Sequence, residues 1–178
     1  MSDKQIATLA GGCFWCLEAV YEQMRGVEEV LSGYIAGEKP NPSYEAVCTG
    51  TSGHAEAVQI TFNPALVTYG ELLSVFFTIH DPTTLNRQGN DKGAQYRSAI
   101  YYHNEEQRTA AAEFMLELEK KQMFSAPLVT ELSVATTFYP AEDYHQHYFA
   151  KHPEQGYCQF VVAPKLAKFK ERFLNKMK

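Results

Sequence analysis

Two glycines, Gly11 and Gly12, separate a strand pattern from a helix pattern near the start of the chain. Residues 5–10 form a short apolar run typical of a strand. After Gly12, apolar residues recur at helical spacing, namely at Phe14, Leu17, Val20, Tyr21 and Met24. The sequence therefore predicts a strand that leads directly into a helix, with Cys13 at the N-terminus of that helix.

The spacing of apolar residues, together with capping and turn residues, predicts the remaining strands and helices. Strands are expected at residues 27–34, 55–62, 98–103 and 128–138, and helices at 68–79, 104–122, 143–151 and 165–177. Residues 83–95 are polar, without apolar periodicity, and are expected to form a functional loop. The order predicts an α+β fold with a single domain over residues 1–178. We expect a split βαβ (ferredoxin-like) sandwich with a mixed sheet and extra C-terminal helices.

Composition narrows the class of protein. Apolar residues make up 45% of the chain, which is enough for a sizeable core. The net charge of −5 argues against a nucleic-acid partner, because binding phosphates needs a basic face. No apolar run approaches the roughly 20 residues of a membrane span, and the first five residues do not resemble a signal peptide. We therefore expect a cytoplasmic protein that does not bind membranes, with a monomer as the default.

Four cysteines are too few and too irregularly spaced for a disulfide scaffold, so they are metal ligands, buried hydrophobic residues or redox catalysts. Cys13 is the strongest candidate for catalysis. A thiol at a helix N-terminus faces the positive end of the helix dipole, which favours the thiolate. The alternative is that Cys13 is a small buried side chain beside a glycine turn.

Cys13 and Cys16 form a C-x-x-C motif, which serves dithiol redox chemistry or half of a zinc site. His145 and His147 are possible partners, either as zinc ligands or as the general base of a cysteine hydrolase. Their i, i+2 spacing diverges on a helix, which disfavours zinc, so no metal is expected. The rings of Phe14 and Trp15, between the cysteines, are suited to enclose a small apolar group.

Four segments together resemble the methionine sulfoxide reductase A family. They are GGCFW at 11–15, SYEAVCTG at 43–50, GHAE at 53–56 and RQGNDKGAQYR at 87–97. The resemblance extends from about residue 5 to the 150s. It implies a single α+β domain that reduces methionine sulfoxide, the S epimer in particular, both free and within peptides, and so repairs oxidised proteins.

The resemblance also implies a role for each matching residue. Cys13 is the nucleophile and becomes a sulfenic acid, while Glu56 is the acid that acts on the sulfoxide oxygen. Burial of Glu56 at the start of a strand is expected to raise its pKa. The resemblance implies that Phe14 and Trp15 form the pocket for the substrate methyl group. It implies that Tyr44 and Tyr96 donate hydrogen bonds to the sulfoxide oxygen. Asp91 is implied as a supporting site residue.

One position departs from the family pattern. The residue after GCFW is usually glycine but here is Cys16. Cys158, beside Gly156, resembles the family's resolving cysteine in a flexible C-terminal region, and we expect it to form the first disulfide. Cys16 is the alternative, either as the first resolving thiol or as a relay. The resemblance implies thioredoxin as reductant. No cofactor is expected, since no G-x-G-x-x-G motif is present.

Overall fold

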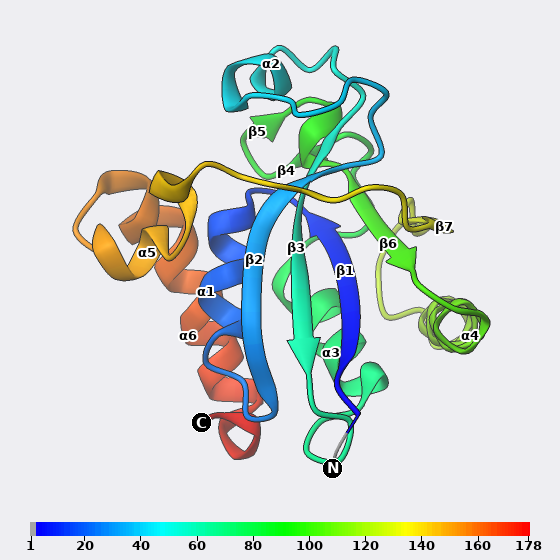
Figure 1. Ribbon diagram of the computed structural model, residues 1–178. Helices are drawn as coiled ribbons and strands as arrows, with labels where there is room; N and C mark the ends of the chain where they lie inside the picture. Colours follow the sequence, from blue (N-terminus) through cyan, green and yellow to red (C-terminus); the bar gives the residue numbers. More distant parts are fainter. Residues whose placement is uncertain (1–2) are drawn as a thin grey trace.

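The computed structural model describes residues 3–178, which are built around a six-stranded sheet (Figure 1). Along the sheet the order is β7-β6-β1-β3-β2-β8, and only β6 and β7 pair in parallel. The strands are β1 (Gln5–Gly11), β2 (Val27–Ile35), β3 (Ala55–Phe62), β6 (Ser98–Tyr102), β7 (Glu131–Val134) and β8 (Tyr139–Pro140). The sheet is therefore mixed, and β1 and β3 lie at its centre.

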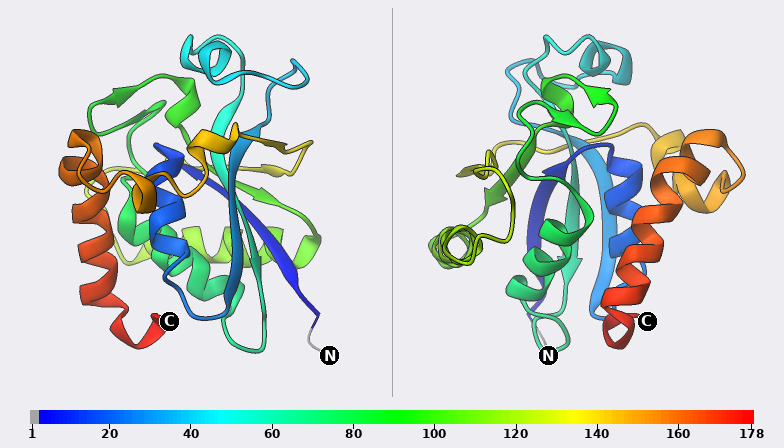
Figure 2. Two further views of the ribbon diagram at one scale, coloured as in Figure 1. Left: turned by 60° about the vertical axis from the view of Figure 1, so that its left-hand side comes forward. Right: turned by 180° about the vertical axis from the view of Figure 1, so that it is seen from behind.

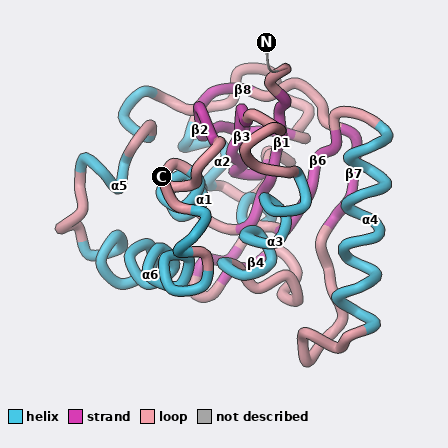
Figure 3. Tube along the Cα trace, turned by 90° about the horizontal axis from the view of Figure 1, so that it is seen from below, coloured by secondary structure: helices cyan, strands magenta, loops and turns pink. Residues whose placement is uncertain are grey.

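Helices cover one face of the sheet, where α1, α3 and α6 lie in front of the strands in the right-hand view of Figure 2. The helix α4 runs beside β7 at the edge of the sheet (Figure 3). The helices are α1 (Phe14–Tyr21), α2 (Tyr44–Cys48), α3 (Tyr69–Ile79), α4 (Glu105–Lys120), α5 (Tyr148–Lys151) and α6 (Ala163–Arg172). Within residues 3–178, no helix is long and apolar enough to cross a membrane.

Local signals explain where the longer helices begin. The side chain of Thr68 accepts a hydrogen bond from the backbone N–H of Glu71 at 3.1 Å, and Asn104 accepts one from Gln107 at 2.9 Å. Both satisfy N–H groups that the first turn leaves free. The predicted strand at 55–62 and the starts of these two helices are confirmed.

Side chains alternate between two cores along the central strand. Ala7 and Leu9 join the large apolar core under the helices, whereas Ala10 belongs to a smaller cluster on the other face. That second cluster also contains Ala55, Ala57 and Ala99, and residues such as Phe138 pack against it. In Figure 1 the segment from β7 to β8 crosses in front of the strands on this side. Small side chains thus allow this segment to lie close to the sheet.

Three expectations differ from the structure. The predicted strand at 128–138 is paired only over β7, because the chain then crosses the sheet. The predicted helix at 143–151 is interrupted, since His147 has a φ of 57°, a left-handed conformation that a right-handed helix excludes. The predicted loop at 83–95 contains a hairpin of β4 (Arg87–Gln88) and β5 (Asp91–Lys92), followed by a 3₁₀ turn at Ala94–Tyr96.

Candidate active site

Cys13 lies at the N-cap of α1, as the sequence predicts, and is 7% exposed. Gly12 before it has a φ of +92°, and a Cβ atom there would lie 2.6 Å from Cγ of Gln88. Only glycine fits such a left-handed position in contact with a neighbouring side chain. The segment of residues 83–95 therefore packs closely against Gly12 and helps to fix the position of the Cys13 thiol.

The thiols of Cys13 and Cys16 lie close enough inside the core for each to shift the pKa of the other. Burial raises the pKa of Cys13 well above its ordinary value, and the charges of Glu56 and Cys16 raise it further. Interaction with the Cys13 thiol lowers the pKa of Cys16. The backbone hydrogen bond from Trp15, at the start of α1, lowers the pKa of Cys13, as expected for a helix N-terminus, while burial acts more strongly in the opposite direction.

Glu56 is 1% exposed on β3, beside the start of α1. Its Oε1 accepts a hydrogen bond from the backbone N–H of Phe14 at 3.1 Å. Burial raises the pKa of Glu56 to about 8, although the bond from Phe14 acts in the opposite direction. Glu56 is therefore mainly a neutral carboxylic acid at pH 7, able to donate a proton next to Cys13.

Tyrosines surround this acid. Burial raises the pKa of Tyr96, and the charges of Glu56 and Cys13 raise it further, which indicates that its hydroxyl lies near both groups. Burial also raises the pKa of Tyr44, whose hydroxyl hydrogen-bonds to Cys48 one turn further along α2. Both hydroxyls stay protonated at neutral pH and can act as hydrogen-bond donors.

Asp91 accepts a hydrogen bond from the hydroxyl of Tyr157 at 2.5 Å. The charges of Cys13 and Cys16 act on Tyr157, so this tyrosine is part of the site. Tyr157 lies outside the sequence motifs that predict the site. Its position directly before Cys158 is the sequence feature that could have identified it as a site residue.

Trp15 and Phe14 belong to an aromatic cluster. The ring of Trp15 stacks on Tyr148 with centroids 3.8 Å apart and planes at 5°. Its indole N–H donates to Nδ1 of His145 at 3.1 Å. Phe14 is fully buried, with its ring centroid 5.7 Å from that of Tyr34 and 5.2 Å from that of His145. This cluster is apolar and adjacent to Cys13.

A second network, also not selected from the sequence, supports the cluster. Glu142 accepts hydrogen bonds from the hydroxyl of Tyr34 at 2.8 Å and from the backbone N–H of Tyr44 at 2.9 Å. Because these residues lie about a hundred positions apart in the chain, no local pattern could connect them.

The two histidines do not take the roles considered for them. His145 is buried, its Nδ1 accepts from Trp15, and burial lowers its pKa, so the ring is neutral. His147 pairs with Glu22 instead. Within residues 3–178 neither histidine hydrogen-bonds to Cys13, and no cysteine belongs to a group of three potential metal ligands. The geometry favours neither a hydrolytic pair nor a Cys₂His₂ site.

Cys158 differs from the expected thiol in a flexible region. It is fully buried and begins a π-helical turn, Cys158–Val162, that continues into α6. The charge of Cys16, rather than that of Cys13, raises its pKa, after the larger effect of burial. Packing of the residues after Gly156 against α1, which the sequence does not reveal, accounts for the difference.

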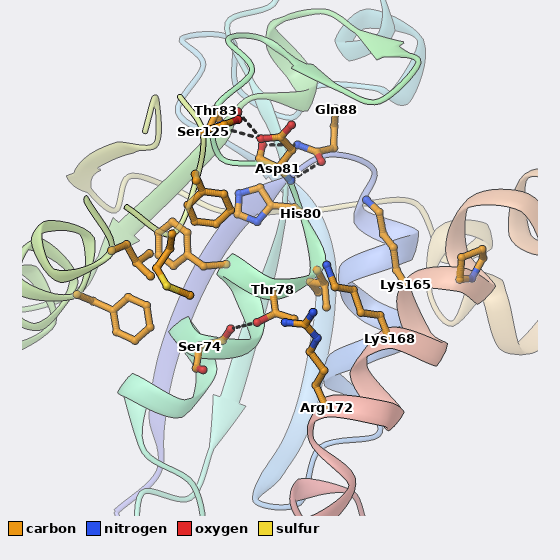
Figure 4. A pocket seen from close by; sticks show the side chains of 17 residues that line it. Ser74, Thr78, His80, Asp81, Thr83, Gln88, Ser125, Lys165, Lys168 and Arg172 are labelled. Carbon is orange, nitrogen blue, oxygen red and sulfur yellow. Dashed lines mark hydrogen bonds between the residues drawn. The ribbon is translucent and has the colours of Figure 1, made fainter. Parts of the chain in front are cut away.

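A hollow of about 740 Å³ lies between α3, α4 and α6 (Figure 4). Lys165, Lys168 and Arg172 from α6 line one side, opposite Ser74 and Thr78 of α3. None of the predicted site residues lines this hollow. It is therefore distinct from the thiol site.

Two neighbouring thiols beside a neutral carboxylic acid and an aromatic cluster are the features of a thiol-dependent oxidoreductase. Residues 5–177 match the family described as peptide methionine sulfoxide reductase. The chain belongs to this family, and its reaction is the reduction of methionine sulfoxide.

Relatives and solved structures agree with this assignment. The chain is 61% identical to a peptide methionine sulfoxide reductase MsrA of Polynucleobacter asymbioticus, over 94% of this chain and 88% of the relative. Reduced Mxr1 of Saccharomyces cerevisiae superposes with a TM-score of 0.79 at 35% identity, covering 89% of this chain and 92% of Mxr1. Mxr1 in complex with Trx2 superposes with a TM-score of 0.56 at 27% identity, covering 83% of this chain and 88% of Mxr1.

Proposed function

We propose that this enzyme reduces the S epimer of methionine sulfoxide, free and in proteins, through Cys13 and Glu56, and that thioredoxin restores the thiols. The observation that carries the proposal is the buried, neutral Glu56 beside the Cys13 thiol. A sulfoxide oxygen leaves readily only when it is protonated or strongly hydrogen-bonded, and Glu56 can supply that proton.

In the first step the sulfur of Cys13 attacks the sulfur of the sulfoxide. Glu56 gives its proton to the sulfoxide oxygen and recovers one from the Cys13 thiol. The oxygen then moves from the substrate sulfur to the sulfur of Cys13: the sulfur–oxygen bond of the substrate and the newly formed sulfur–sulfur bond break, and a bond between the oxygen and the Cys13 sulfur forms. Methionine leaves, and Cys13 is left as a sulfenic acid. The sulfoxide is reduced by two electrons, Cys13 is oxidised by two, and the number of protons is unchanged.

Hydrogen bonds and apolar contacts orient the substrate. The hydroxyls of Tyr44 and Tyr96 donate to the sulfoxide oxygen and stabilise its developing charge without ionising, since both pKa values are raised. Asp91 supports the site through its hydrogen bond with Tyr157. The rings of Phe14 and Trp15 enclose the methyl group.

The second step forms a disulfide and releases water. The family resemblance favours Cys158 as the first resolving thiol, but the interaction between the neighbouring thiols of Cys13 and Cys16 favours Cys16. We infer that Cys16 attacks the sulfenic acid first and that Cys158 then attacks Cys16, releasing the Cys13 thiol. Thioredoxin would reduce the final disulfide. The Trx2 complex of Mxr1 supports this choice of reductant.

Turnover with each sulfoxide epimer tests the proposal. Purified enzyme is supplied with thioredoxin, its reductase and either S or R methionine sulfoxide, and methionine is quantified by chromatography. We expect continuous methionine formation from the S epimer and none in the Cys13→Ser control. Equal rates with both epimers would contradict the stereochemical assignment, and turnover without any dithiol would contradict the redox cycle.

Fold type, location, oligomeric state and cellular role complete the proposal. The strand order β6-β1-β3-β2 supports classification of the core as a ferredoxin-like split βαβ sandwich. We further propose that the enzyme acts in the cytoplasm as a monomer and repairs oxidised proteins there. The reducing environment of that compartment suits a catalyst whose resting cysteines are free thiols.

A further inference from the structure

A second cluster of polar side chains lies further along α1, away from the thiols. Glu18 is in α1, Glu22 is its C-cap, and His147 comes from the segment just before α5. One ligand atom from each of the three residues lies within 4.8 Å of the others. The two carboxylates are one helical turn apart, so they share a face of the helix.

Glu18 is not satisfied by its protein neighbours. The residue is 1% exposed, and its Oε2 is buried without a hydrogen-bond partner within residues 3–178. Burial raises the pKa of Glu18 to about 7, helped by the charge of Glu22, although the neighbouring backbone of His147 and Tyr148 acts in the opposite direction. A buried carboxylate oxygen without a partner is unfavourable and calls for a proton or a cation.

His147 alone cannot neutralise the pair of carboxylates. Its Nδ1 hydrogen-bonds to Oε1 of Glu22, and its side chain is 59% exposed. One imidazolium carries a single charge, whereas Glu18 and Glu22 together carry two when ionised. When both carboxylates are ionised, the cluster therefore retains one excess negative charge even with a protonated histidine.

The cluster borders a hollow that is lined by acidic side chains. A hollow of about 550 Å³ is lined by Glu22 and His147, and also by Glu28 and Glu29, with Lys178 as its only lysine or arginine. A cation could thus enter from solvent along negatively charged side chains and keep water molecules on that side.

We propose that Glu18, Glu22 and His147 bind a divalent first-row transition-metal ion. Two carboxylate oxygens and one imidazole nitrogen form a set suited to Mn²⁺ and Zn²⁺. The metal takes the place of the hydrogen bond between His147 and Glu22 and gives the buried Oε2 of Glu18 its missing partner.

Such a metal would join two parts of the chain that are 125 residues apart, as the pairing of His147 with Glu22 already does. The segment next to His147 holds His145 and Tyr148, both of which contact Trp15. The ion would therefore stabilise the packing of this segment on α1, because a ligand that binds only the folded state stabilises it.

Titration with Mn²⁺ tests the proposal. Metal-free enzyme is titrated in a calorimeter and, in parallel, by electron paramagnetic resonance, which separates free from bound Mn²⁺. Mn²⁺ is chosen because thiolates prefer softer metals, so Cys13 and Cys16 compete little. We expect saturable binding of one equivalent, with a rise in the melting temperature.

Variants locate the site. Glu22→Gln and His147→Gln should each weaken Mn²⁺ binding by roughly tenfold or more. Glu18→Gln should do the same, but because it alters a buried side chain, its fold is first checked by circular dichroism. Glu113→Gln and His152→Gln, which change exposed residues outside the cluster and its hollow, should bind Mn²⁺ like the unaltered enzyme.

Absence of saturable Mn²⁺ binding would overturn the proposal. So would binding that survives His147→Gln and Glu22→Gln unchanged, or that weakens equally in the two control variants. All of these measurements report on metal binding and stability, and their outcome does not depend on the proposed redox cycle.

Discussion

The backbone N–H of Phe14 donates a hydrogen bond to Oε1 of Glu56 at 3.1 Å. This bond connects the residue after the nucleophile directly to the acid, across 42 positions of sequence. The first turn of α1 thereby holds the carboxyl group next to Cys13, while burial keeps it neutral. The nucleophile and the proton donor are positioned by the same helix terminus.

The proton-donor role predicts different effects for two substitutions of Glu56. Glu56→Gln should retain much of the activity, because an amide N–H still donates a hydrogen bond to the sulfoxide oxygen. Glu56→Ala removes the donor and should lower kcat by roughly 10²–10³-fold. Single-turnover rates with S methionine sulfoxide measure both. Equal rates in the two variants would remove Glu56 from this role.

The raised pKa of Glu56 predicts a dependence of stability on pH. Its pKa in the folded state is about 8, above its ordinary value of 4.5. The protonated carboxyl group therefore contributes fully to stability below about pH 4.5, and this contribution is lost as the pH rises through 8.

Melting temperatures of the unaltered enzyme and Glu56→Gln, compared from pH 5 to pH 9, test this dependence. The enzyme should lose stability relative to the variant as the pH rises. Glu18 titrates in a similar range, but it is present in both proteins and largely cancels from the difference. A difference that stays constant with pH would contradict the assignment.

The proposed order of disulfides predicts distinct products for three cysteine variants. Cys13→Ser should abolish reduction, because no nucleophile remains. After one equivalent of sulfoxide, Cys158→Ser should stop at a disulfide between Cys13 and Cys16, and Cys16→Ser should accumulate the sulfenic acid of Cys13. Mass spectrometry with a sulfenic-acid trap identifies each product. Rapid formation of a Cys13–Cys158 disulfide in Cys16→Ser would favour the order that the family resemblance implies.

The contact at Gly12 predicts a destabilising effect of a single methyl group. In Gly12→Ala, a β-carbon at a φ of +92° would lie 2.6 Å from Gln88. Strain and overlap should lower the free energy of unfolding by about 1–3 kcal/mol and displace Cys13, which lowers activity. Gly156→Ala is a matched control, since nothing lies within 4 Å of its added carbon. Urea denaturation of both variants measures the difference.

Local sequence patterns predicted much of the fold. The caps at Thr68 and Asn104 act within three residues, and the strand at 55–62 is a local run of mostly apolar residues, so both could be predicted without tertiary information. The end of β7 could not be predicted from the sequence, because it depends on the following segment crossing the sheet over the small side chains of distant strands. His147 likewise interrupts a helical pattern through a backbone conformation that no local signal indicated.

For the site, the sequence by itself determined the thiol at a strand-to-helix junction, the C-x-x-C spacing and, through its family segments, the residues expected around the substrate. Only the tertiary structure decided their chemical state. Desolvation and the charge of Glu56 raise the pKa of Cys13 against the effect of its own helix, and the packing next to α1 buries Cys158. The reason is one of range: caps and helix dipoles act within a turn, whereas burial and Coulomb interactions arise from residues that only folding brings together.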